Sequence, residues 1–542
     1  MLLLFAALLI AAVFLAKLST KLGMPVLIAF IGIGLLVGSD ALNLIYFDDA
    51  ALTKRIADIL LIFILFVGGF KTQRASLKTV AGPALTLATL GVALTAVFLG
   101  LIIYLITRQP LANCFMIASI ISSTDAAAVM MTTRGNPLAD RVAATLEVES
   151  ASNDPAAILL TIAFLDLVLQ EQSSGGKIHV ASLIGSLAWQ FLGGLGVGFL
   201  VSKLAAVLFD KLESEDRGYY HVLIIGVILF AYGGADLIRA NGIIAVFFMG
   251  YWLGNADFVG KRGVSNFLDG ISTFSNIALF LMLGLLAFPR NFAFVWKEGL
   301  IIAALLIFVV RPVVVFLCVA PFGYTLREKL FIAWGGIKGA VPIVLATYPA
   351  AYGLDPDGTI FNIIFFAVLI SCVVQGTTMA PLARALRLTV PPKPRSPHTL
   401  ELNSVRKTNI DMFEMQIEAN SPAAGKRISD LDLPNDVLIS SIVRNGKIIA
   451  PRGTSLILPN DILFVLGPRY SMDLVTATLT GSATLTGSSD GAGSGGVAGM
   501  AGMAQARSGV TETSSPDTLS NTDTACTNDV PSNRESNKGS QQ

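Results

Sequence analysis

Two carboxylates lie close together in an otherwise apolar stretch of the chain. Glu149 and Asp154 belong to the sequence Glu-Ser-Ala-Ser-Asn-Asp-Pro at 149–155, and the apolar run 156–165 follows directly. A charged side chain at membrane depth costs about 2.5–3.5 kcal/mol on insertion scales, so it usually faces a polar cavity and marks an ion or proton path. We therefore expect Asp154 to lie on such a path, and a structural ion pair is the alternative.

On a helix, the polar residues of this motif divide between two neighbouring faces. Ser150 and Asp154 are four residues apart, as are Glu149 and Asn153, so the members of each pair share a face. One carboxylate can therefore face a cavity while the other turns towards a partner inside the protein.

Two cations in apolar segments qualify as such partners. Arg311 precedes a proline, and Lys338 lies in Gly-Gly-Ile-Lys-Gly-Ala-Val-Pro at 335–342. A buried arginine stays charged and needs a fixed anion. If these two cations are taken up by Glu149 and Asp125, Asp154 remains unpaired. An unpaired acid at this depth can hold either a proton or a monovalent cation, and that competition is an exchange mechanism. We expect three other acids near span ends to be solvated: Asp58, Asp166 and Asp236.

The composition is that of an integral membrane protein. Hydrophobic residues make up 54% of the 542 residues and charged residues only 14%, whereas soluble domains carry about 25% charged residues. The net charge of +1 and the lack of a basic cluster give no reason to expect nucleic-acid binding. The sequence contains no phosphate loop, nucleophile elbow or metal-ligand spacing, so neither an enzyme nor a bound cofactor is expected.

Hydropathy predicts about thirteen transmembrane helices, and therefore an all-α polytopic membrane protein embedded in lipid. The first span has no basic leader and is expected to be retained. With the N-terminus outside, inner loops hold twelve Lys and Arg residues and outer loops seven, which predicts a cytoplasmic C-terminus in a cell inner membrane. The spans lie roughly at 2–18, 24–38, 56–71, 84–106, 111–132, 143–169, 181–208, 219–238, 241–254, 271–288, 299–323, 328–352 and 360–383.

Part of the chain recurs after 216 residues. The segment 27–38 aligns with 243–254, and an alanine and two glycines coincide. The same shift carries spans three to six onto spans ten to thirteen. An odd offset of seven spans gives the halves opposite topology, and inverted repeats (spans 1–6 and 8–13) are an architecture of many secondary transporters. A chance match is the alternative for one pair of segments alone.

Two corresponding spans of these repeats are interrupted. Ser-Ser-Thr-Asp at 122–125 lies in the middle of the fifth span, and 335–342 lies in the twelfth. Broken spans in corresponding positions mark the binding site in such transporters. We expect the two broken helices to cross at the midplane, with Asp125 near positive half-helix ends and Lys338 near negative ones.

The composition changes after residue 388. Residues 389–399 are proline-rich and predict an extended linker. Residues 400–475 predict a small cytoplasmic α/β module, and residues 476–542 a disordered low-complexity tail.

Inside the module, two strands are predicted at 437–443 and 447–450, joined by a hairpin at Asn445-Gly446. A further strand is predicted at 462–466. The transmembrane domain itself is assigned to residues 1–388.

Three of these motifs together are similar to the signatures of the monovalent cation:proton antiporter-1 family, and most similar to its bacterial NhaP-type potassium/proton branch. They lie at 123–129, 149–155 and 335–342, and the resemblance covers about residues 1–388. The module resembles the C-terminal subdomain of RCK potassium-regulating proteins, also called TrkA-C, on the motifs at 442–446 and 451–454.

The resemblance implies a homodimer in which a core with the crossed helices moves against a dimerisation domain. It implies that Asp154 carries the cation and the proton, with Ser150 and Thr124 as further ligands of the monovalent cation. Asn153 would shape the site.

The resemblance also implies two ion pairs at the site, Glu149 with Arg311 and Asp125 with Lys338. Two residues depart from the pattern of many relatives: Ala126 stands where they have proline, and Lys338 where they have arginine. Lysine cannot form a bidentate fork, so a point-charge pairing with Asp125 is expected.

The predicted function is exchange of K⁺ for H⁺ by alternating access, with Na⁺ as the alternative cation. A single titratable carrier predicts one ion per proton and hence electroneutral exchange. The RCK-like module is expected to regulate transport and is a candidate for binding a nucleotide or other small ligand, or else only aids dimerisation. A potassium channel-associated subunit and a membrane sensor are the rival readings.

Overall fold

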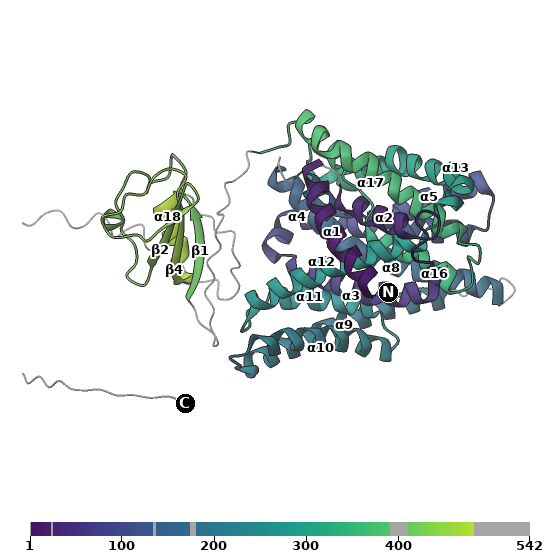
Figure 1. Ribbon diagram of the computed structural model, residues 1–542, viewed down its shortest axis with the longest axis horizontal. Helices are drawn as coiled ribbons and strands as arrows, with labels where there is room; N and C mark the ends of the chain where they lie inside the picture. The colour runs from purple at the N-terminus through teal and green to yellow at the C-terminus, as the bar shows by residue number, and fades with distance from the viewer. Residues whose placement is uncertain (1, 23–24, 134–136, 174–179, 391–409, 482–542) are drawn as a thin grey trace, which may run out of the picture. The chain divides into compact units, whose positions relative to one another are not determined.

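The computed structural model describes residues 2–481 apart from 23–24, 134–136, 174–179 and 391–409, so most of the predicted linker and the predicted tail lie outside the described residues. The part up to residue 390 is helical (Figure 1). Its helices are α1 (Leu2–Leu22), α2 (Val26–Val37), α3 (Ala50–Lys71), α4 (Arg74–Thr86), α5 (Val92–Thr107), α6 (Leu111–Ile120), α7 (Ala126–Thr132), α8 (Asp140–Ser173), α9 (Val180–Leu212), α10 (Arg217–Leu237), α11 (Gly242–Gly254), α12 (Lys261–Leu286), α13 (Pro289–Leu305), α14 (Arg311–Val319), α15 (Leu326–Trp334), α16 (Ala340–Ala351) and α17 (Thr359–Ala385).

The helices coincide with the thirteen predicted spans. Among the described residues, seven helical segments are long and apolar enough to cross a membrane, and five shorter apolar helices accompany them. A π-helical turn, η1 (Leu87–Gly91), joins α4 to α5 into one span, and η2 (Leu306–Val310) joins α13 to α14. The fifth and twelfth spans are broken, as predicted, into α6 and α7 and into α15 and α16.

The sequence repeat is also a repeat of packing. In the first half α2 packs on α12, and in the second α11 packs on α3. A Cβ atom at Gly34 of α2 would lie 2.8 Å from the Gly284 Cα, and one at Gly250 of α11 would lie 3.1 Å from the Phe70 backbone nitrogen. Because both crossings need a glycine at positions 216 residues apart, the match is more than a coincidence of residue types.

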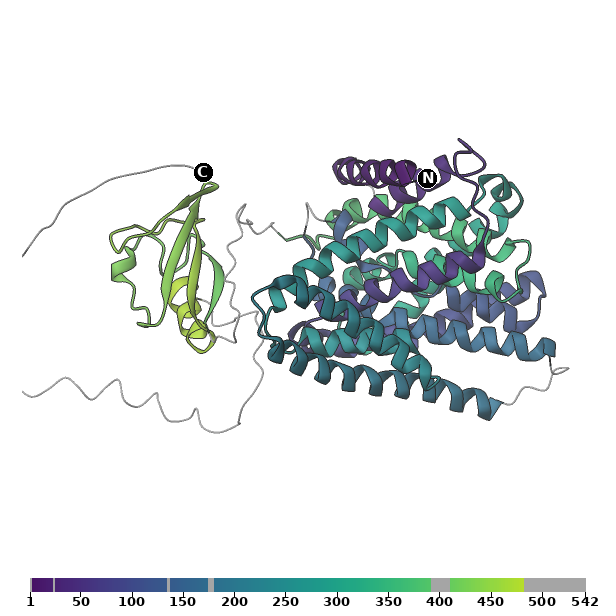
Figure 2. The same ribbon diagram turned by 60° about the horizontal axis from the view of Figure 1, so that its bottom comes forward.

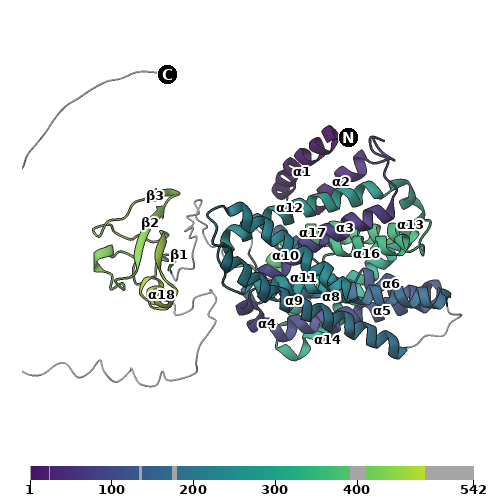
Figure 3. The ribbon, with the colours of Figure 1, turned by 90° about the horizontal axis from the view of Figure 1, so that it is seen from below.

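The transmembrane helices form two groups by their contacts. The crossed-helix bundle comprises α4–α8 and α13–α17, and the flanking bundle comprises α1–α3 and α9–α12. Helices α3, α9, α10, α11 and α12 share a hydrophobic core of their own. The purple N-terminal helix α1 lies at one edge (Figures 2 and 3), and α4 and α14 lie at the opposite edge in Figure 3. The two bundles meet where α16 contacts α3 and α12.

The C-terminal module is a four-stranded antiparallel sheet in the order β1-β4-β2-β3, followed by α18 (Met472–Thr480). Its strands are β1 (Ile410–Gln416), β2 (Leu438–Arg444), β3 (Lys447–Ile449) and β4 (Ile462–Pro468). The predicted hairpin is confirmed, because Asn445 and Gly446 both have positive φ and join β2 to β3. Helix α18 runs to residue 480, so the folded module extends past the predicted boundary at 475.

Candidate ion-binding site

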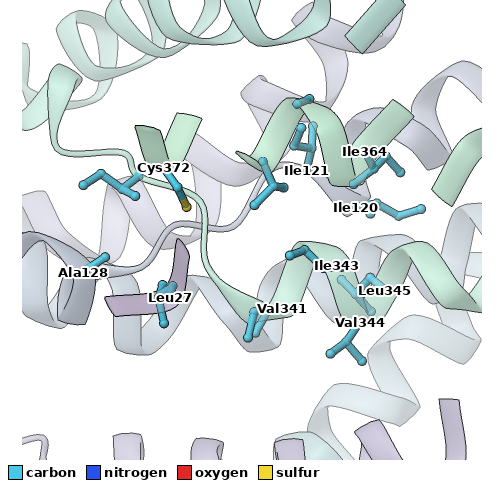
Figure 4. Close-up of a cluster of buried hydrophobic side chains, with 14 of the residues drawn as sticks. Leu27, Ile120, Ile121, Ala128, Val341, Ile343, Val344, Leu345, Ile364 and Cys372 are labelled. Carbon is cyan, nitrogen blue, oxygen red and sulfur yellow. The ribbon is translucent and has the colours of Figure 1, made fainter. Parts of the chain in front are cut away.

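The two helix breaks meet each other. The backbone N–H of Asp125 donates to the carbonyl of Ile337 at 2.7 Å, so the break between α6 and α7 lies against the break between α15 and α16. A Cβ atom at Gly339 would lie 2.6 Å from the Asp125 side chain, so only glycine permits this approach. Apolar side chains of α6, α7, α16 and α17 surround the crossing (Figure 4).

Asp125 caps the helix that follows it. Its carboxylate oxygen Oδ1 accepts hydrogen bonds from the backbone N–H groups of Ala127 at 2.8 Å and Ala128 at 3.3 Å. These are free donors of the first turn of α7. The predicted position of Asp125, at a positive half-helix end, is therefore confirmed.

Lys338 caps the opposite kind of helix end. Its buried ammonium donates to the carbonyls of Ser122 at 3.1 Å and Ser123 at 2.9 Å, just after α6 ends. This confirms its predicted place near a negative half-helix end. The expected ion pair with Asp125 is not formed, however. The free carbonyls satisfy the lysine and the free N–H groups satisfy the aspartate, so each charge compensates backbone rather than the other charge.

Glu149 and Arg311 form the expected ion pair. Arg311 Nη1 lies 2.7 Å from Glu149 Oε1, and the two side chains are 6% and 1% exposed. Apart from this contact, Glu149 Oε2 and Arg311 Nε and Nη2 are buried without hydrogen-bond partners in the described structure. The pair thus holds α8 against α14 from inside the crossed-helix bundle.

Three further predicted site residues form one hydrogen-bond network between α8 and the first break. Ser150 Oγ donates to the Thr124 carbonyl at 3.0 Å and accepts from the Ala126 N–H at 2.9 Å. Asn153 Nδ2 donates to Thr124 Oγ1 at 2.6 Å. The structure therefore brings Thr124, Ser150 and Asn153 together, as predicted.

Asp154 differs from the other charges at the crossing. Its side chain is partly exposed, as is that of Asp125, but neither an ion pair nor a helix end compensates its charge in the described structure. The charges of Asp125 and Lys338 act on it from nearby. The Ser123 hydroxyl lies beside it but has no hydrogen-bond partner of standard geometry. This carboxylate is thus the acid of the site that neither an ion pair nor a helix end satisfies in the described structure.

Oxygen atoms around Asp154 suit an alkali cation. Ser123 Oγ and Asn153 Oδ1 are buried, and neither has a hydrogen-bond partner in the described structure. Hard cations bind oxygen ligands, and these two neutral oxygens with one carboxylate carry a single negative charge. The arrangement can hold one monovalent cation or one proton at Asp154.

Residues of α17 brace the second break, and the sequence motifs did not predict this role. Gln375 donates to the Trp334 carbonyl at 2.8 Å and accepts from Ser371 Oγ at 2.5 Å, while Ser371 Oγ accepts from the Lys338 N–H at 3.3 Å. Cys372 Sγ donates to the Lys338 carbonyl at 3.0 Å. These contacts fix the second break. The polar Gln375 inside an apolar span is the sequence feature that could have indicated this role.

Comparison with known proteins adds family relationships. A family model described as "Sodium/hydrogen exchanger, transmembrane" matches residues 7–385, and one described as "TrkA-C domain" matches residues 412–480. The K(+)/H(+) antiporter NhaP2 of Shewanella sp. (strain ANA-3) is 33% identical, over 86% of this chain and 80% of its own length. The K(+)/H(+) antiporter NhaP of Alkalimonas amylolytica is also 33% identical, over 83% of this chain and 78% of its own.

A solved structure shares the helical architecture. The sodium proton antiporter MjNhaP1 of Methanocaldococcus jannaschii superposes with a TM-score of 0.62 at 26% identity, over 71% of this chain and 99% of that one. The described helical part and the antiparallel module thus both have counterparts among known proteins.

Proposed function

Because the chain belongs to the sodium/hydrogen exchanger family, a family of membrane antiporters, we propose that it exchanges K⁺ for H⁺, with Na⁺ as the alternative cation. Relatives at 33% identity, which the chain covers over about four fifths of their length, are named K(+)/H(+) antiporters. A relative named Na(+)/H(+) antiporter 1 is 29% identical over 68% of this chain. The relatives with the higher identity are the ones named K(+)/H(+) antiporters, and they support K⁺ as the transported cation.

The observation that carries the proposed mechanism is the contrast between Asp154 and its charged neighbours. Glu149 is held by Arg311, and Asp125 and Lys338 each compensate backbone groups. Among these described acids, Asp154 is the one whose charge is compensated neither by an ion pair nor by a helix end. A proton and a cation then compete for the same carboxylate, so Asp154 carries only one of the two at a time.

Competition predicts the pH dependence of exchange. Where protons occupy the carrier, each unit of decrease in pH raises the apparent KM for the cation by about tenfold, because one proton displaces one cation. Since Asn153 rather than a second acid lies beside Asp154, one carrier moves one charge in each direction. Exchange is then electroneutral.

The test is exchange in reconstituted vesicles with K⁺, Na⁺, Rb⁺ and Li⁺ across pH. Asp154→Asn is expected to abolish exchange of every ion while the protein remains folded. Asp166→Asn, on the same helix α8 but three turns away, is the matched control and should keep exchange. Full activity of Asp154→Asn would refute the carrier assignment, and exchange of Na⁺ without K⁺ would overturn the choice of ion.

The surroundings of this exchanger form part of the same proposal. The lysine and arginine distribution supports an N-terminus outside and a cytoplasmic C-terminus in a cell inner membrane. We infer a homodimer, and a regulatory role for the module at residues 410–480 in which a nucleotide or other small ligand binds. Truncation after residue 390 should leave exchange but change its pH dependence; an unchanged profile would assign the module to dimerisation alone.

A further inference from the structure

A buried polar contact joins the two bundles away from the ion site. The Tyr348 hydroxyl of α16 donates to Asp58 Oδ1 of α3 at 2.7 Å, and Lys54 Nζ donates to Asp58 Oδ2, also at 2.7 Å. Asp58 and Lys54 are only 13% and 20% exposed. The expectation that Asp58 is a solvated charge near a span end is therefore wrong.

The contact also includes a cation–π interaction. Lys54 Nζ lies 4.3 Å from the centroid of the Tyr348 ring, so the ammonium contacts both the carboxylate and the aromatic face. Tyr348 itself is buried. We call Lys54, Asp58 and Tyr348 the α3–α16 latch. In the described structure, no hydrogen bond or ion pair joins these three side chains to a further helix.

The latch lies next to a polar cavity. A cavity of about 240 Å³ is lined by Ala50, Thr347 and Ala350, together with loop residues such as Asp357. Lys54 and Asp58 lie one and two helical turns farther along α3 than Ala50, which is about 6 and 12 Å. Tyr348 lies between the two cavity residues of α16. The latch therefore borders this cavity at the α3–α16 interface.

The opposite side of the site carries exposed charged side chains. Glu147 lies two turns before Asp154 on the same face of α8, about 10 Å away, and is exposed. Near it, Lys71 of α3 and Asp269 of α12 form an ion pair whose side chains are 53% and 47% exposed. Lys71 is the last residue of α3, whereas Lys54 and Asp58 lie in its first half, so the exposed pair and the latch lie in opposite halves of that helix.

We propose that the α3–α16 latch is the closed gate between the ion site and the side of the membrane that carries the loop 352–358. This inference rests on the proposed exchange function, because a gate has meaning only where access alternates. Asp58 and Tyr348 are positioning residues in this device: they do not bind the transported ion, and they set which side of the site is open. Opening requires α16 to part from α3.

The Tyr348 half-helix connects the gate to the site directly. Helix α16 begins at Ala340, two residues after Lys338, and reaches Tyr348 after two turns. A movement of the crossed-helix bundle that re-aims the break therefore also moves the Tyr348 hydroxyl relative to Asp58. Gate and ion site are thus coupled through one rigid element.

The test measures access rather than transport. Val344→Cys places a thiol one turn deeper than Tyr348 on the same face of α16, at a position that is fully buried (Figure 4). A membrane-impermeant maleimide is added to the loop 352–358 side of reconstituted vesicles, with Asp357→Cys as the marker of that side. The protein with its native cysteines alone gives the blank.

A hydrogen bond to a charged group sets the expected size of the effect. Its loss in Tyr348→Phe shifts the closed-to-open ratio by about tenfold to a hundredfold, so the labelling rate of Val344→Cys should rise by at least tenfold. Tyr352→Phe is the matched control, since Tyr352 lies one turn away and its hydroxyl makes no hydrogen bond in the described structure. It should leave the rate unchanged.

Two results would refute the proposal that the latch is a gate. One is rapid labelling of Val344→Cys with the latch intact, and the other is an equal rate in the Tyr348→Phe and Tyr352→Phe backgrounds. Both readouts are independent of exchange. If Asp154→Asn retained exchange while Tyr348→Phe opened the path, the carrier assignment would fail and the gate would stand.

Discussion

Removing Arg311 tests how the crossed-helix bundle tolerates its internal charge. Arg311→Met takes away the guanidinium 2.7 Å from Glu149, whose side chain is 1% exposed and has no other hydrogen-bond partner in the described structure. An uncompensated buried charge of this kind costs about 3–5 kcal/mol. We expect the single variant to lose that much free energy of unfolding.

The double variant Glu149→Met with Arg311→Met separates the pair from the mere loss of a side chain. Replacing both buried charges by apolar groups is neutral or stabilising by about 1–4 kcal/mol in comparable cases. The double variant should therefore recover most of the stability that the single variant loses. This non-additivity is the coupling energy of the two side chains.

Unfolding can be followed by tryptophan fluorescence in mixed micelles on titration with a denaturing detergent. Trp334 ends α15 beside the second break, and its indole N–H donates to Thr378 Oγ1 at 2.9 Å, so its emission reports on the crossing. A single variant within about 1 kcal/mol of the parent would refute the reasoning, because 3–5 kcal/mol is expected. A double variant as unstable as the single one would refute it too.

Other variants test the compensation of helix ends at the crossing. Lys338→Met leaves two buried carbonyls unsatisfied and should lose about 1.5–3 kcal/mol of stability in the same titration, whereas Lys338→Arg should lose less because it keeps the donors. Gly339→Ala places a methyl group 2.6 Å from the Asp125 side chain and should abolish exchange, while Gly32→Ala, with open space around it, should leave exchange intact. Asn153→Ala removes the bond to the first break and should raise the KM for the cation by about fivefold in vesicle exchange, for a bond worth about 1 kcal/mol. An imposed membrane potential should change neither the rate nor the final ion gradient of the parent protein, and a strong effect would contradict electroneutral exchange.

Sequence patterns were sufficient to predict the helices and strands and much of the candidate site. Apolar runs fixed the spans because lipid requires continuous apolar helices, and the glycines and hydroxyls at 122–125 and 335–342 marked the two breaks because those residues interrupt such helices. The polar turn Asn445-Gly446 fixed the hairpin through its preference for positive φ. The positions of Asp125 and Lys338 at half-helix ends followed from helix dipoles.

The partners of those charges, in contrast, could be identified only from the folded protein. Lys338 donates to the carbonyls of Ser122 and Ser123, which lie 216 and 215 residues away in the chain. Whether it takes these carbonyls or the Asp125 carboxylate depends on distances of a few ångströms, which sequence spacing does not supply. The brace through Gln375 and the contact of Asp58 with Tyr348 have the same origin, since their partners lie on helices that meet only after folding. Sequence patterns report the environment of a residue along its own helix. Contacts between helices also depend on how closely the helices approach, and here the glycines at the crossings set that distance.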